Sequence, residues 1–310
     1  MPRQAPLIAS AAPGATIVAM GEHSGLSEFE SHRDRLFGIA YRMLGSQADA
    51  EDVVQEAYLR WHATVGEVRQ PEKWLTTVTT RLSIDRLRAV KAARTSYSGP
   101  WLPEPIVEFS LDSRLDRDHD VSLAFLRMLE RLSAEERAVF LLREVFDISY
   151  AEVAESVGKS EAACRQMLHR ARERVRDERV RFEVDSSEHM RLLERFGKAV
   201  CTAEGDAFPQ IFAQDVIYIS DGGGKVLAAS RPVLGSRAVS RIFVNVSRSL
   251  RGEISMTLAS VNGQPGLLLW TGGSVFAVMT ANVADGEIQE LYCVRNPDKL
   301  SHVHPPRREP

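Results

Sequence analysis

The chain has 310 residues, of which 44% are hydrophobic, and its 39 lysines and arginines stand against 42 acidic residues. This length predicts two or three domains, and a formal net charge of −3 excludes a protein that is basic over its whole surface. Cys164, Cys201 and Cys293 lie far apart with no Cys-x-x-Cys pair. This argues against a disulfide scaffold and a structural zinc site and indicates a reducing compartment.

Residues 1–24 are interpreted as a disordered tail. The apolar stretch APLIASAAPGATIVAM at 5–20 is interrupted by Pro13 and Gly14, and only Arg3 precedes it as a positive charge, which does not fit a signal peptide. No run in the chain is long and apolar enough to span a bilayer. We therefore expect no membrane partner and a cytoplasmic location.

Apolar residues at helical spacing predict two helices between residues 26 and 61. Gly45 is expected to end the first helix, because glycine adopts the left-handed conformation easily. The acidic residues Asp49, Glu51 and Asp52 lie at the start of the second helix, where the helix dipole favours negative charge. The second helix then leaves a polar edge beside its apolar stripe, made by Asp52, Gln55 and Glu56. Taken alone, such an edge is most often a solvated face.

A basic helix is predicted from residue 72 to about residue 94, with Pro71 suited to its entry. Between Lys73 and Arg94 there are six basic residues and one acid, Asp85, which we expect to be an internal ion-pair partner. Hydroxyl and aromatic side chains share this helix with the charges. Such a face can hold a phosphate backbone and stack unpaired bases. Trp74 is interpreted first as a core residue and second as a stacking surface.

Residues 96–120 form the expected linker. It begins with the proline-rich stretch SYSGPWLPEP, which should be stiff and extended. It continues with six acids against two basic residues between Glu104 and Asp120. The acidic part is interpreted either as a solubilising spacer or as a mimic of nucleic acid.

Residues 121–182 are predicted to be helical and to include a helix-turn-helix. Ser133 and Glu136 have the spacing of a capping box. Further on, SYAEVAESVGKSEAACRQMLHRARERVR predicts helices at 150–157 and from 161, with a turn at Gly158 and Ser160 as N-cap. An ordinary helical hairpin with a charged face is the alternative. Five arginines against one glutamate between residues 165 and 176 favour the DNA-binding interpretation.

After residue 187 the pattern changes to an α+β domain. Helical pieces are expected over 187–205 and 208–213. Alternation and β-branched content predict strands at 215–221, 225–230, 254–262, 266–272, 274–285 and 287–295, forming a curved antiparallel sheet. Gly222 to Gly224 and Asp285-Gly286 are expected to form hairpin turns. The string DGGGK lacks the spacing of a phosphate-binding loop, so the turn interpretation is preferred.

Three motifs carry a resemblance to a known family: DAEDVVQEAYLRW at 49–61, PEKWLTTVTTRLSIDRLR at 71–88, and the helix-turn-helix. In this order and spacing they resemble regions two and four of bacterial sigma factors, in the short plan of the extracytoplasmic-function class, over roughly residues 27–181. The resemblance implies two all-α domains that bind core RNA polymerase and promoter DNA. It also implies that the chain directs transcription initiation without being an enzyme, since bond formation belongs to the polymerase.

The same resemblance assigns roles to residues. The surface that docks on the polymerase would be Asp52, Val53, Val54 and Gln55. The −10 element would be contacted by the loop at 62–72 and by Lys73, Trp74, Arg81, Arg86 and Arg88. A base of its non-template strand would be flipped into a pocket of this region. The −35 element would be met in the major groove by Ser160, Glu161, Arg165, Gln166, His169 and Arg170. Whether Arg165 contacts a guanine or a phosphate stays open.

The C-terminal pattern resembles the SnoaL-like branch of the cone-shaped nuclear-transport-factor-two superfamily. WLPEP at 101–105, DGGGK at 221–225 and NPDKL at 296–300 together resemble the sigma-factor subgroup with a fused SnoaL-like extension. That implies regulation in cis in place of a separate anti-sigma protein. The implied regulatory contacts are Trp101, Glu104, Asp221, Gly222, Gly223, Gly224, Lys225, Asn296, Pro297, Asp298, Lys299 and Leu300. Asp221 and Lys225 are expected to touch Trp101 and Glu104.

The expected domains are a tail at 1–24, region two at 25–95, the linker at 96–120, region four at 121–182, the SnoaL-like domain at 187–303 and a tail at 304–310. No metal or cofactor is expected, and a small-molecule ligand of the cone is left undetermined. The first alternative function is a one-component DNA-binding regulator with a sensing cone. The second is a cyclase-like enzyme, for which Asp215, Tyr218, Asp221 and Glu290 are available without any pair being singled out.

Overall fold

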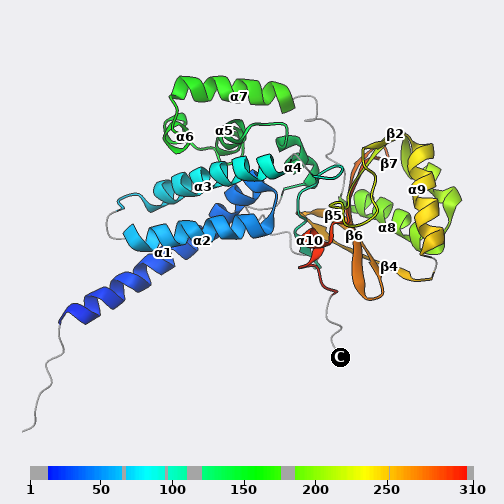
Figure 1. Cartoon of the computed structure of the whole chain (residues 1–310), viewed down its shortest axis with the longest axis horizontal. Coiled ribbons are helices and arrows are strands. Elements are labelled where there is room, and N and C mark those ends of the chain that lie inside the picture. Colours follow the sequence, from blue (N-terminus) through cyan, green and yellow to red (C-terminus); the bar gives the residue numbers. More distant parts are fainter. Residues whose placement is uncertain are drawn as a thin grey trace, which may run out of the picture.

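Two helical units and a sheet-containing unit make up the protein, as Figure 1 shows. The computed structural model describes residues 13–64, 68–94, 97–109, 121–175, 186–250 and 252–305. The acidic half of the expected linker, residues 110–120, lies outside these ranges, as do residues 1–12 and 306–310 of the two expected tails.

The first helical unit contains α1 (Pro13–Leu44), α2 (Gln47–Thr64) and α3 (Pro71–Arg94). Gly45 ends α1 with a φ of 66°, as expected. Trp61 and Leu75 lie in the core between the helices. Helix α1 begins at Pro13, inside the stretch 1–24 that was interpreted as a tail. Proline fits the first turn of a helix, where its missing N–H costs nothing.

The second helical unit contains α4 (Leu123–Leu129), α5 (Ala134–Glu144), α6 (Tyr150–Val157) and α7 (Glu161–Val175). The capping box of Ser133 and Glu136 at the start of α5 is confirmed. Gly158 turns the chain between α6 and α7 with a φ of 66°, and the Ser160 hydroxyl accepts a hydrogen bond from the backbone N–H of Ala163 at 3.2 Å. Cys164 is buried against the preceding helices. The predicted helix-turn-helix is therefore present.

The sheet-containing unit begins with α8 (Ser186–Thr202) and a 3-10 helix (Gly205–Gln210). It continues with β2 (Phe212–Asp221), β3 (Val233–Leu234), α9 (Ser236–Ser249), β4 (Ile254–Val261), β5 (Gln264–Thr271), β6 (Ser274–Ala284), β7 (Glu287–Val294) and α10 (Pro297–Leu300). The strand order is β1-β4-β5-β6-β7-β2-β3, in which β1 (Val107–Glu108) comes from the linker. The pair β2–β7 is parallel and the other described pairs are antiparallel, so the sheet is mixed.

Several details of this unit differ from the expectation. Residues 225–230 form no strand, and the strand that pairs with β2 is the two-residue β3 farther along. Gly222 to Lys225 therefore makes a turn into a loop and not a hairpin. The helix α9 was not expected at all. Asp285 and Gly286 do turn the chain between β6 and β7, with φ values of 54° and 74°.

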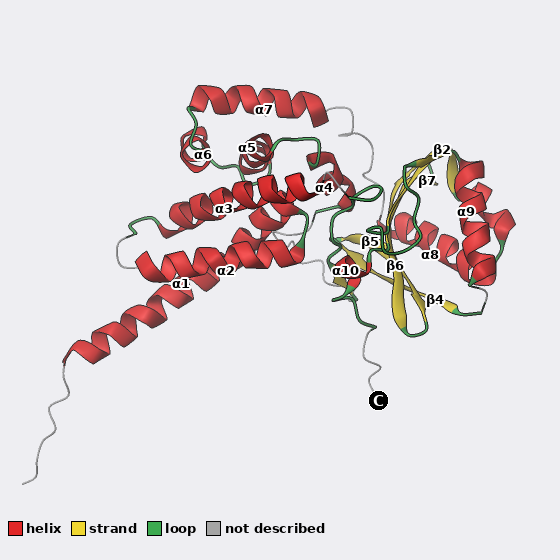
Figure 2. Ribbon diagram, viewed as in Figure 1, coloured by secondary structure: helices red, strands yellow, loops and turns green. Residues whose placement is uncertain are grey.

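The two faces of the sheet have different partners. Helices α8 and α9 cover one face, where a cluster of phenylalanines fills the interior: Phe196, Phe208, Phe212 and Phe243. Residues of the other face, including Trp270 and Tyr292, belong to one hydrophobic cluster with Tyr41, Leu102 and Leu126 of the helical part. Figure 2 shows the yellow sheet between α8 and α9 on one side and the helical units on the other. The three units thus share a continuous core.

Candidate functional site

The polar edge of α2 is only partly available to a partner. The side chain of Asp52 is 69% exposed, and Gln55 is also exposed. Val53 and Val54 are buried, so neither presents a side chain to a protein that docks on this helix. Of the four residues expected to touch the polymerase, the structure leaves Asp52 and Gln55 on the surface. The two valines instead anchor α2 in the core.

The exposed face of α3 meets the end of α6. The Arg81 guanidinium donates hydrogen bonds to the main-chain carbonyl oxygens of Glu155 (2.7 Å) and Ser156 (3.2 Å). Lys73 forms an ion pair with the Glu155 carboxylate at 2.7 Å, and the hydroxyls of Thr77 and Ser156 are 3.1 Å apart. In this arrangement the residues expected at the −10 element contact the second helical unit.

The remaining residues of that set also have partners within the chain. Arg86 donates to Asp49 of α2 at 2.6 Å. Arg88 donates to Asp85 at 3.2 Å and to Glu135 of α5, which confirms Asp85 as an ion-pair partner. Trp74 packs beside Trp61, with ring centroids 5.9 Å apart. Packing in the core therefore describes the position of Trp74 in this structure better than a role as a stacking surface for bases.

The outward face of α7 is open. Arg165 is 55% exposed, pairs with Glu161 at 2.7 Å and lies 4.7 Å from the centre of the Tyr150 ring. The side chain of His169 is 76% exposed and that of Arg170 52% exposed, and Gln166 is exposed as well. From Arg170 onward, α5 neutralises part of the arginine edge, since Arg170 and Arg174 pair with Glu136 and Arg172 pairs with Glu144. The start and middle of α7 are thus the part that suits the major groove. The expected member Ser160 acts as the cap of this helix.

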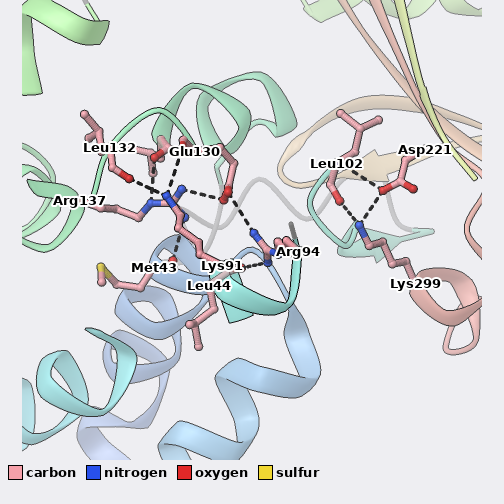
Figure 3. Close-up of polar contacts among 11 residues, drawn as sticks. Met43, Leu44, Lys91, Arg94, Leu102, Glu130, Leu132, Arg137, Asp221 and Lys299 are labelled. Carbon is pink, nitrogen blue, oxygen red and sulfur yellow. Dashed lines mark hydrogen bonds and ion pairs between the residues drawn. The ribbon is translucent and has the colours of Figure 1, made fainter. Parts of the chain in front are cut away.

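A buried carboxylate joins the linker to the sheet-containing unit. Asp221, at the end of β2, is completely buried and accepts four hydrogen bonds. The donors are the Tyr97 hydroxyl (2.5 Å), the Leu102 N–H (2.9 Å), the Gly223 N–H (2.9 Å) and the Lys299 ammonium (2.7 Å). Figure 3 shows Lys299 between Asp221 and the Leu102 carbonyl. Burial lowers the pKa of Lys299 to about 8, against the opposing effect of Asp221.

Trp101 holds the linker against the first helical unit. Its ring lies between the Arg94 guanidinium, 3.4 Å from the ring centre, and the Lys299 ammonium at 4.2 Å, which are cation–π contacts. A Cβ atom on Gly45 would lie 2.7 Å from the Trp101 ring, so this close approach needs glycine. The string WLPEP therefore ties the end of α1 to α10.

Glu104 continues this attachment. Its carboxylate accepts from the Gln47 N–H at the start of α2 at 2.9 Å, and its backbone N–H donates to the Gly45 carbonyl at 2.8 Å. The Tyr41 hydroxyl donates to the Glu104 carbonyl at 2.6 Å and accepts from the Asn262 amide at 2.7 Å. One buried tyrosine thus connects α1, the linker and the end of β4. Burial raises the pKa of Tyr41.

The three short strings lie together, although with different pairings from those expected. Asp221 reaches the linker at Tyr97 and Leu102, and Lys225 pairs with Asp298 at 2.6 Å on the surface. In the glycine string, Gly223 has a φ of 63°, and a Cβ there would lie 2.4 Å from the Asn296 side chain. Turn geometry and close approach therefore both require glycine there. Of the other expected members, Gly222 and Gly224 complete the turn, Asn296 caps α10, and Pro297 and Leu300 belong to that helix.

A second buried network joins the two helical units, and sequence reasoning missed it. The Arg137 side chain is 1% exposed and donates to Glu130 (2.7 Å) and to the carbonyls of Leu129 and Met43. Arg94 shares the Glu130 carboxylate at 3.0 Å (Figure 3). Burial, followed by repulsion from Arg137, lowers the pKa of Lys91 to about 8. Hydrophobic spacing within one helix gives no sign of such contacts across units.

The groups considered for an acid–base pair are occupied in other ways. Asp221 holds the linker, while Glu290 accepts hydrogen bonds from Asn282 (2.6 Å) and Tyr292 (2.5 Å). Tyr218 is buried in the phenylalanine cluster, and Asp215 is exposed. Among the residues that the structure describes, no cluster of His, Cys, Asp or Glu has an arrangement that could hold a metal ion. No helix within the same residues has the length and apolar character needed to cross a membrane.

Comparisons with known proteins agree with this architecture. Residues 29–93 match the family model of sigma-70 region 2, and residues 122–175 match that of sigma-70 region 4. The chain is 37% identical to the extracytoplasmic-function RNA polymerase sigma factor SigJ of Mycobacterium tuberculosis, over 89% of this chain and 93% of SigJ. It is 29% identical to a probable sigma factor SigI of the same species, over 91% and 97% of the two chains. The crystal structure of M. tuberculosis SigJ superposes with a TM-score of 0.71 at 36% identity, covering 89% of this chain and 98% of SigJ.

Proposed function

The chain belongs to the extracytoplasmic-function RNA polymerase sigma factors, and we propose that it binds core RNA polymerase and directs the enzyme to promoters to start transcription. The observation that carries the proposal is the exposed face of α7 on a helix-turn-helix, on the same chain as the exposed polar edge of α2. A protein that only bound DNA would need no second docking edge. Phosphodiester synthesis belongs to the polymerase, so no reaction is assigned to this chain.

The roles of individual residues follow from their exposure. Asp52 and Gln55 dock on the polymerase, while Val53 and Val54 hold α2 in position. Arg165 and its neighbours on α7 read the −35 element, where a bidentate contact to guanine contributes roughly 1–3 kcal/mol of discrimination. Lys73 and Arg81 on α3 contact the −10 element. The chain acts in the cytoplasm, where the polymerase is.

We also propose that the sheet-containing unit inhibits the sigma units in cis. It holds the first unit through Tyr41 and the linker, and it reaches the second unit through Arg127 of α4, which lies 5.8 Å from the Tyr292 ring centre. One body thus holds the two helical units in one arrangement, and we infer that they must move apart to contact the −10 and −35 elements together. A separate anti-sigma protein is then not required.

Run-off transcription tests the proposed function. Purified core polymerase is incubated with a library of genomic fragments, with or without the chain, and transcript 5′ ends are mapped. We expect the chain to create new, specific start sites that share two sequence elements. Core polymerase that binds the chain without gaining specific starts would contradict the proposal.

A further inference from the structure

The contact between α3 and α6 has an unusual chemical composition. Arg81 donates to two carbonyl oxygens in the last turn of α6, those of Glu155 and Ser156. Carbonyls in the last turn of a helix have no partner within the helix and carry the negative end of its dipole. Lys73 forms an ion pair with the Glu155 carboxylate, and the Thr77 hydroxyl is hydrogen-bonded to the Ser156 hydroxyl. The end of α6 therefore presents to α3 a row of negative and hydrogen-bonding oxygens.

These oxygens have the same chemistry as a nucleic-acid backbone. Arginine and lysine bind phosphate oxygens by charge-assisted hydrogen bonds, and threonine hydroxyls do so by neutral ones. Lys73, Thr77 and Arg81 follow one another at four-residue intervals, so they form one stripe along α3. We propose that this stripe has two partners that exclude each other: the end of α6 in the free chain, and the single-stranded −10 DNA in the promoter complex. The proposal rests on the proposed sigma function.

The edge of the α3–α6 contact is held weakly. The Lys73–Glu155 pair is 34% and 54% exposed, so it contributes little to stability. A cavity of about 130 Å³, lined partly by Arg35, Thr76 and Ser156, lies in the same contact. Polar, loosely packed interfaces of this kind are typical of units that separate.

The closed arrangement affects the two DNA elements differently. It engages all three residues of the stripe on α3, buries Thr77 and leaves Lys73 and Arg81 partly exposed. Arg165, His169 and Arg170 on α7 are exposed in the same arrangement. Binding of −35 duplex therefore needs no opening of the α3–α6 contact. Binding of the −10 strand requires α6 to leave.

A reversible disulfide tests the exclusion. The Thr77 and Ser156 oxygens are 3.1 Å apart, so Thr77→Cys with Ser156→Cys places two sulfurs within bonding reach. Of the chain's own cysteines, Cys164 and Cys293 are buried. A disulfide between Cys201 and one of the new cysteines would also form in the single variants at positions 77 and 156, which therefore serve as controls. Each variant is either oxidised or reduced with dithiothreitol. It is then assembled with core polymerase on a promoter found by run-off mapping. Transcripts, open-complex formation and binding of the −35 duplex are measured.

We expect the oxidised double variant to give about tenfold fewer transcripts than the same sample after reduction. Its affinity for −35 duplex should stay within about twofold, and neither single variant should respond to the oxidant. An oxidised double variant, with the disulfide verified, that transcribes as well as its reduced form would overturn the proposal. If the wild-type chain yields no specific transcripts, it is the proposed sigma function that fails, and this outcome is recognised from the wild-type sample alone.

A second variant opens the contact from the side that does not bind DNA. Ser156→Arg places a guanidinium against Arg81, and charge repulsion should separate α6 from α3. We expect several-fold tighter binding of a fluorescent −10 single strand by the free chain, while intact −35 duplex binding shows that the helix-turn-helix is folded. Unchanged −10 binding by a variant with intact −35 binding would contradict the exclusion.

Discussion

Asp221→Asn is predicted to detach the linker from the sheet-containing unit. The substitution keeps the shape of the side chain but removes the charge that faces Lys299, whose side chain is only 12% exposed. Breaking a buried ion pair on one side costs roughly 3–5 kcal/mol. Lys299 can limit this cost by losing its proton, and at pH 7 deprotonating a lysine with an ordinary pKa costs roughly 4–5 kcal/mol. Since burial already lowers the pKa of Lys299 to about 8, losing the proton costs this lysine less, and we expect a loss of docking free energy at the lower end of the range, about 3 kcal/mol.

Amide hydrogen exchange measures this loss directly. The N–H groups of Glu104 and Asn262 donate to the Gly45 and Ile106 carbonyls where the docked linker contacts the end of α1 and the end of β4, and neither touches Asp221. If they exchange when the linker detaches, about 3 kcal/mol corresponds to roughly 150-fold faster exchange.

The matched control is Asp298→Asn, in the neighbouring ion pair with Lys225. That pair is 64% and 54% exposed, so its loss should change exchange by less than about threefold. Equal acceleration by the two variants, or none by Asp221→Asn, would refute the argument from burial.

Three further predictions concern the polymerase edge, the −35 helix and a buried histidine. Asp52→Ala with Gln55→Ala should weaken core polymerase binding about tenfold without lowering the melting temperature, because both side chains are exposed; unchanged affinity in a binding titration would remove this edge from the interface. Arg165→Ala should lower affinity for −35 duplex about tenfold, whereas Arg191→Ala, also exposed but on α8, should not; equal effects would indicate non-specific charge. Burial lowers the pKa of His189 to about 4, so the unfolded chain binds the extra proton below pH 6.5 and stability is lost as the pH falls from 6.5 towards 4. His189→Gln should therefore reduce the drop in denaturation midpoint between pH 7 and pH 5, and an identical drop in both proteins would count against this assignment.

Features fixed by short-range signals could be predicted from the sequence. Ser133 with Glu136, Gly158 and Ser160 each act within a few residues, and the helix-turn-helix follows from them. Asp85 was placed correctly as an ion-pair partner because its partner Arg88 lies one turn away on the same helix.

For contacts between distant segments, the resemblance placed the DGGGK string near the linker, but the individual partners could not be predicted. The Asp221 carboxylate is bound by groups from residues 97, 102, 223 and 299, and nothing in the DGGGK string indicates the first two. Pairing of Val107 with Val261 makes a linker residue part of the sheet, although two residues carry no strand pattern of their own. Helix α9 was not predicted, although Val239 and Phe243 are four residues apart and buried; its β-branched residues lower the helix propensity of this stretch.

Inhibition in cis by the sheet-containing unit is tested most directly by transcription from one promoter at saturating core polymerase, comparing the full chain with a chain that ends at residue 185. The shortened chain lacks Asp221, Asn262 and Lys299, so nothing fixes the linker to a third body. It should therefore give more transcripts per polymerase than the full chain. A shortened chain that binds core polymerase equally well but gives fewer transcripts would contradict inhibition and show that the unit supports the active arrangement.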